Sequence, residues 1–182
     1  AFDAIRATID LGGTAAMDIP AVVDLVYAKV EEDDISIGNA TDSAADDTNL
    51  LGVNIGTKFD RGEAEAYFFA KKDNSVAVLN LATKAQANTL GVRGSFAPVD
   101  GSDVWSELAY QWGNRITSAI TYDAEGAPGD DYQAWALNLG ADYTATDVAW
   151  SPTVGGEWVY FSGDNGTQGG TGTGIGGWDG MY

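Results

Sequence analysis

Cysteine and histidine are both missing from the 182 residues of this chain. Their absence excludes disulfide bonds, zinc sites of the usual type, haem ligation by histidine and nucleophilic catalysis by cysteine or a serine–histidine pair. Carboxylates alone could still catalyse a reaction, although the most common general base is missing. The sequence therefore favours a protein that is not an enzyme and has no metal or cofactor.

Long apolar runs are missing as well. No segment approaches the roughly 18 consecutive apolar residues that a membrane-spanning helix needs, so a membrane location would require a β-barrel. The chain also shows no signal peptide and begins inside a predicted strand. We therefore expect it to be a mature or incomplete segment of a protein.

Positive charge is scarce, because 9 lysines and arginines face 27 aspartates and glutamates, for a net charge of −18. This balance argues against binding to nucleic acid and against a polybasic attachment to an anionic membrane surface. With 45% hydrophobic and 11% aromatic residues, the chain has enough apolar surface for a folded body. Its length fits a single domain.

What the chain does contain is an alternation of apolar and polar side chains. In segment 104–113, Val104, Leu108 and Tyr110 share one face, whereas Glu107 and Gln111 share the other. This period of two is typical of a strand with one apolar face. The pattern predicts strands at 1–11, 21–32, 49–59, 63–72, 88–97, 104–113, 131–143 and 148–161.

Segment 21–32 has a second interpretation. Pro20 could stand at the first position of a helix, but β-branched residues and Tyr27 dominate the segment and favour a strand.

The gaps between these strands alternate in length. Gaps 33–48, 73–87 and 114–130 are long and 12–20 is moderate, whereas 60–62, 98–103 and 144–147 are short. Outer-membrane barrels have short periplasmic turns and long external loops. We therefore predict an all-β fold, an antiparallel up-and-down transmembrane β-barrel in which 1–182 form one domain or barrel segment and 162–182 a glycine-rich external loop.

Aromatic residues gather near the strand ends on the apolar face. In a barrel they would form two interfacial girdles against outer-membrane lipid, although aromatics are also common in the core of any sheet. The candidate lipid-interface residues are Phe59, Phe96, Tyr110, Trp112, Trp135, Tyr143, Trp150, Trp158 and Tyr160.

The polar face is the candidate functional surface. In a barrel wide enough to hold water its side chains would line a channel and set its selectivity. In a narrow barrel the same side chains would form ion pairs that plug the interior, and the sequence leaves both readings open. The candidate channel-lining residues are Arg6, Arg93, Glu107, Gln111, Asp142 and Glu157.

Loop 31–47 is strongly acidic, and clustered carboxylates are ligands that calcium prefers. The loop lacks the spacing of an EF-hand, so solvated loop charge is the favoured interpretation. Calcium binding remains the alternative.

Several segments resemble the alginate-export type of outer-membrane β-barrel. They are Ala-Ile-Arg-Ala-Thr-Ile-Asp, Asp-Leu-Val-Tyr-Ala-Lys-Val, Asn-Thr-Leu-Gly-Val-Arg-Gly, Glu-Leu-Ala-Tyr-Gln-Trp-Gly and Ser-Pro-Thr-Val-Gly-Gly-Glu-Trp-Val-Tyr-Phe-Ser-Gly-Asp. The closing Gly-Trp-Asp-Gly-Met-Tyr is similar to a loop of that family, with Gly180 where proline is usual. The resemblance spans nearly all of 1–182.

The resemblance implies a barrel of more than eight strands, so this chain would be part of a larger wall. It also implies diffusion of an anionic polysaccharide through an arginine-rich lumen, with Arg6 and Arg93 at matching positions. Because arginine and lysine are few here, a general porin-like channel is favoured over one for alginate.

We therefore expect a channel of the bacterial outer membrane for passive passage or export of small or polysaccharide solutes, anionic or neutral. The alternatives are a small closed barrel with a structural or adhesive role, and a secreted soluble β-sandwich that binds carbohydrate. The transported solute and the oligomeric state are left open.

Overall fold

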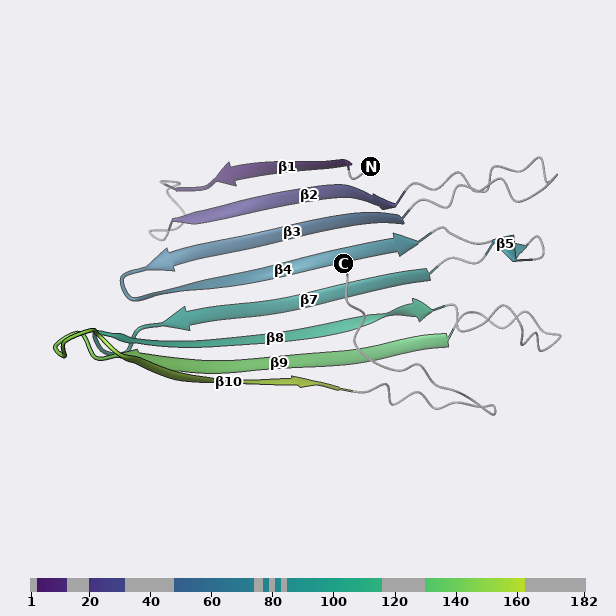
Figure 1. Ribbon diagram of the computed structural model, residues 1–182. Helices are drawn as coiled ribbons and strands as arrows, with labels where there is room; N and C mark the ends of the chain where they lie inside the picture. Colours follow the sequence, from purple (N-terminus) through teal and green to yellow (C-terminus); the bar gives the residue numbers. More distant parts are fainter. Residues whose placement is uncertain are drawn as a thin grey trace.

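A computed structural model describes residues 3–12, 20–31, 48–73, 77–78, 81–82, 85–115 and 130–162. Eight long strands form one sheet, and each lies beside its neighbours in the chain (Figure 1). All pairings within it are antiparallel. The strands are β1 (Asp3–Asp10), β2 (Ala21–Glu31), β3 (Thr48–Phe59), β4 (Gly62–Asp73), β7 (Ala85–Phe96), β8 (Ser102–Arg115), β9 (Asp130–Thr144) and β10 (Thr153–Phe161).

The predicted all-β, antiparallel up-and-down architecture is thus confirmed. The segment predicted as a strand from residue 21 forms a strand and not a helix over Ala21–Glu31. A separate two-stranded hairpin, β5 (Ala77–Val78) and β6 (Leu81–Ala82), lies in the connection between β4 and β7. In the part of the chain that the structure describes, no helix is long and apolar enough to cross a membrane.

The prediction was wrong at the start of the last strand. Strand β10 begins at Thr153, not at 148, and the connection before it runs over 145–152. Trp150 and Ser151 have φ values of 68° and 40°, which extended backbone does not allow. The amide of Ala145 donates a hydrogen bond to the carbonyl oxygen of Pro152 at 3.0 Å, which closes the turn.

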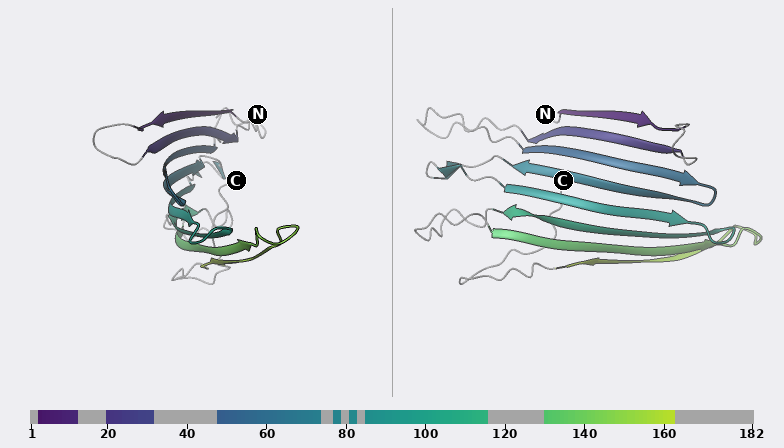
Figure 2. Two further views of the ribbon diagram at one scale, coloured as in Figure 1. Left: turned by 90° about the vertical axis from the view of Figure 1, so that its left-hand side faces the viewer. Right: turned by 180° about the vertical axis from the view of Figure 1, so that it is seen from behind.

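The sheet is open and curved. Strands β1 and β10 are its two edges, and among the described residues they do not pair with each other. Figure 2 shows the sheet end-on as a trough with one concave and one convex side. This is the shape of part of a barrel wall, and not of an eight-stranded barrel closed on itself.

Register decides which side chains share a face, because directly paired residues of adjacent strands point to the same side. Val92 pairs with Leu108, which pairs with Leu137, so these three are on one face. One position along, Arg93 pairs with Glu107, which pairs with Asn138, and these are on the other. We call the two sides the apolar face and the polar face.

The apolar face is uncovered. Large side chains from seven of its strands are well exposed, including Ile5 (71%), Leu51 (58%) and Trp158 (53%). A soluble sheet would bury such a surface against a second layer, and a contiguous patch of this extent marks contact with lipid or a partner. Burial is concentrated instead on the polar face, where Gln111, Ala134 and Ala109 are almost inaccessible.

Candidate functional site

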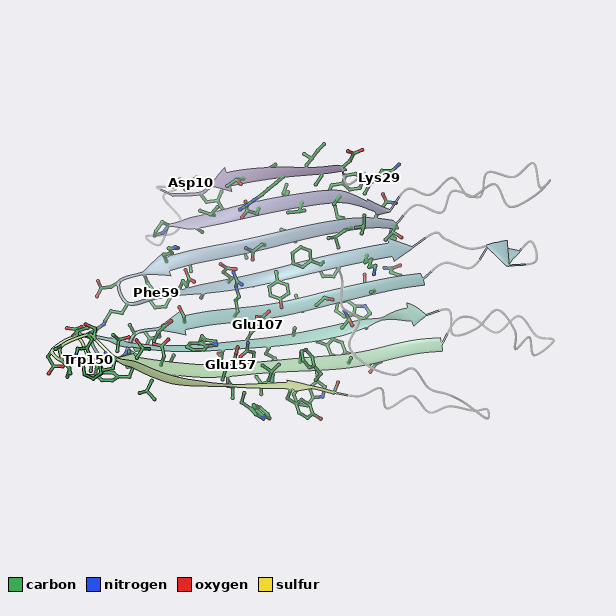
Figure 3. The ribbon with its side chains drawn as sticks, in the orientation of Figure 1. Asp10, Lys29, Phe59, Glu107, Trp150 and Glu157 are labelled. Carbon is green, nitrogen blue, oxygen red and sulfur yellow. The ribbon has the colours of Figure 1, made fainter. Side chains whose placement is uncertain are left out.

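The polar face lies on the concave side of the trough, the side seen in Figure 3, where Glu107 and Glu157 are labelled. The six residues predicted to line a channel all belong to this face by register: Arg6, Arg93, Glu107, Gln111, Asp142 and Glu157. The structure does not bring them into one cluster. Each instead lies within a local group of polar partners.

Arg93 on β7 is held by Glu65 on β4. Its Nε and Nη2 atoms lie 2.8 and 2.7 Å from Glu65 Oε2, and the two residues are direct cross-strand partners. Asn54 Nδ2 on β3 also donates to Glu65 Oε2, at 3.4 Å. One carboxylate therefore links three adjacent strands.

Glu107 on β8 accepts a hydrogen bond from the phenol of Tyr67 on β4. Strand β7 lies between these two strands, and the Tyr67 ring passes over it at Gly91. A Cβ atom at Gly91 would lie 2.2 Å from Tyr67 Cζ, so the ring needs a residue without a side chain there. The contact therefore depends on glycine at position 91.

The same arrangement occurs twice more on this face. Phe69 lies over Gly52, and Trp105 lies over Gly140, in each case across a direct strand pair. The rings of Tyr67 and Phe69 are 5.6 Å apart. Three aromatic side chains thus lie against the wall of the concave face.

Arg6 on β1 forms a two-point contact with Asp24 on β2. Its Nε atom lies 2.9 Å from Oδ1 and its Nη2 atom 2.7 Å from Oδ2. The hydroxyl of Thr8 donates to the same carboxylate at 2.5 Å. Paired donors of this kind fix the orientation of both charged groups.

Glu157 on β10 accepts a hydrogen bond from Asn138 Nδ2 on β9, at 2.8 Å. The Oδ1 atom of Asn138 is buried and has no hydrogen-bond partner among the described residues. Asp142 is paired in register with Asp103 on β8, so two carboxylates face each other across the strands. Gln111 is fully buried and donates to the hydroxyl of Thr89 at 3.0 Å.

A pocket of about 310 Å³ opens on the polar face between β4 and β9. Carboxylates dominate its lining, with one arginine and one indole. The residues that line it are Glu63, Glu65, Arg93, Gly94, Ser95, Asp103, Trp105, Ser106, Glu107 and Asn138.

Sequence reasoning missed most partners of the predicted residues. Asp24, Glu65, Tyr67 and Asn138 were not selected, although alternation alone puts each on the polar face of its strand. Trp105 has the same period-two spacing as Glu107 and Gln111 and so belongs to the polar face, but only those two residues were selected there. Which partner each charged group meets depends on strand register, and the sequence does not give it.

Eight of the nine predicted lipid-interface aromatics lie on the apolar face by register. Tyr110 stacks on Trp112 at 5.6 Å, and Trp135 and Tyr160 are 4.7 Å apart, toward the ends that carry the longer connections. Phe59, Phe96 and Tyr143 lie near the short turns. Trp150 is not on a strand, and is 90% exposed in the turn before β10.

In the part of the chain that the structure describes, no group of three or more carboxylates has an arrangement that could hold a metal ion. The acidic loop 31–47 and the glycine-rich segment 162–182 lie outside the described residues, apart from Glu31 and Ser162.

The family model described as "Alginate export" matches residues 1–180. No curated protein and no solved structure matches the chain.

Proposed function

Because this chain belongs to the alginate export family of outer-membrane export channels, we propose that its polar face is the wall of a water-filled lumen through which solutes pass passively. The observation that carries this proposal is the opposition of the two faces. An apolar face whose large side chains are exposed on seven strands suits the hydrocarbon of a membrane, and a charged concave face suits water. Transport along such a wall needs no covalent chemistry.

The open side of the trough (Figure 2) favours a water-filled channel over a narrow barrel that ion pairs would plug. The ion pairs on the polar face, such as Arg6–Asp24 and Arg93–Glu65, join adjacent strands along the wall. A plug would require pairs that cross the lumen. The secreted β-sandwich has no support, because no second sheet covers the apolar face among the described residues.

The proposal is tested by single-channel recording. Purified protein is inserted into planar lipid bilayers, and we expect stable conductance steps. Arg93→Ala removes a lumen charge and should shift the reversal potential in a salt gradient toward cations. Lys72→Ala is the matched control, because Lys72 carries the same charge on the apolar face.

Two results would contradict the proposal. A folded, inserted protein that gives no current would favour the structural or adhesive role. Protein that stays monomeric in water without detergent would rule out every membrane role.

A further inference from the structure

Trp105 lies flat on the concave wall. It pairs in register with Gly140, and a Cβ atom there would lie only 2.1 to 2.5 Å from the indole atoms Cε2, Cζ2 and Nε1. The missing side chain lets one face of the indole pack on β9. The side chain is only half-buried, so its other face is available to a ligand in the trough.

The space in front of this indole is the 310 Å³ pocket described above. Its volume is at the lower end of the range for small-molecule sites, which is about 300 to 1,000 Å³. The puckered ring of a single sugar unit fits a space of this volume. Sugar rings present apolar C–H faces to aromatic side chains and hydroxyl groups to carboxylates and amides.

The charge of the pocket is uneven. Arg93, the cation that lines the pocket, already pairs with Glu65, and the lining carboxylate Glu63 pairs with Lys58. Asp103 and Glu107 have no cation within salt-bridge distance in the described ranges, since Arg93, the cross-strand neighbour of Glu107, makes its ion pair with Glu65.

Asp142 is not one of the lining residues, but it lies directly opposite Asp103, which is. Like charges directly opposite each other are unfavourable, and a bound cation would relieve this repulsion. The same field repels a polyanion. An indole face also attracts a cation through its ring electrons.

We propose that this pocket is a binding subsite for a saccharide unit that carries a protonated amine, with the ring stacked on Trp105 and the ammonium group near Asp103 and Asp142. The inference rests on the proposed function, since it takes the polar face to be open to solutes. It differs from that proposal in naming the class of solute and in excluding uronate polymers as the preferred one.

The test compares how three oligosaccharides block the channel current: oligomers of glucosamine, of glucose and of glucuronate. We expect the glucosamine oligomer to block at the lowest concentration and the glucuronate oligomer at the highest. Trp105→Ala should weaken block by glucosamine oligomers roughly three- to tenfold, whereas Trp105→Phe should keep most of it. Trp158→Ala on the apolar face is the matched control and should leave block unchanged.

The carboxylates are tested separately. The double substitution Asp103→Asn with Asp142→Asn keeps the side-chain shape and should abolish the preference of glucosamine over glucose oligomers. If Trp105→Ala does not fold, this double variant still tests whether the pocket is a subsite for an amino sugar.

Three results would overturn the inference: strongest block by glucuronate oligomers, an unchanged block in a folded Trp105→Ala, or an unchanged preference in the Asn variant. If the protein gives no current at all, calorimetric titration with glucosamine oligomers in detergent micelles separates the two proposals. Binding that Trp105→Ala weakens would keep the subsite and reject the channel, and no binding would reject the subsite.

Discussion

The phenol of Tyr67 on β4 donates a hydrogen bond to the carboxylate of Glu107 on β8, across a whole intervening strand. It does so because Gly91 on that strand has no side chain to block the ring. Direct pairs stabilise a sheet between adjacent strands only. This contact ties three strands together on the face that we propose to be the lumen wall.

The Tyr67 contact predicts an unequal cost for two glycine substitutions. Gly91→Ala would force the ring off the wall and should lower the free energy of unfolding by about 1 to 3 kcal/mol, as overpacking does. Gly156→Ala is the control, since a Cβ atom there has nothing within 4 Å. Urea unfolding in lipid vesicles, followed by tryptophan fluorescence, measures both, and equal midpoints would contradict the packing argument.

The lipid-facing role of the apolar face predicts a dependence on depth. Leu108 is in the middle of β8 and Phe96 is at the turn end of β7, and their exposures are nearly equal, 49% and 47%. Leu108→Arg should cost about 2 to 4 kcal/mol, but Phe96→Arg only about 0 to 1 kcal/mol, because arginine near an interface reaches water. A soluble sheet would show no such difference in unfolding experiments.

Glu65 links Arg93 and Asn54, so removal of its charge should leave Arg93 without its counter-ion. We expect Glu65→Gln to increase the anion-to-cation permeability ratio by roughly two- to fivefold, the size of an exposed ion-pair effect. Reversal potentials in a salt gradient measure it. A ratio that stays the same would place this pair outside the ion path.

The two aromatic environments predict different quenching. Trp158→Phe should reduce the fraction of fluorescence that brominated lipids quench, because Trp158 is on the apolar face. Trp105→Phe should reduce the fraction that acrylamide quenches from the aqueous side. If Trp105→Phe instead reduced quenching by brominated lipids and Trp158→Phe reduced quenching by acrylamide, the polar face would be the one in contact with lipid.

The turn conformations predict effects of opposite sign. Ser151 has a φ of 40°, so Ser151→Gly should stabilise the fold by up to about 1 kcal/mol. Gly101 has a φ of 82°, and an added Cβ would lie 2.3 Å from the carbonyl oxygen of Thr144, so Gly101→Ala should destabilise it by more. Thermal or urea unfolding of both variants gives the comparison, with the wild type between them.

The sequence by itself determined which residues form strands and which side each side chain takes. Alternation with a period of two is a local property, so it identified Glu107 and Leu108 as members of opposite faces without any knowledge of their partners. It failed at Trp150 and Ser151, because the positive φ values of a turn leave no mark on the apolar pattern.

Only the tertiary structure decided which residues meet. The pairing of Arg93 with Glu65, the Tyr67 ring over Gly91 and the Trp105 ring over Gly140 all depend on the register of strands far apart in the chain. A shift of two residues would keep every side chain on its face and change every partner. The absence of cysteine and histidine and the scarcity of positive charge restricted the chemistry, and strand register assembled the polar face that carries the proposed function.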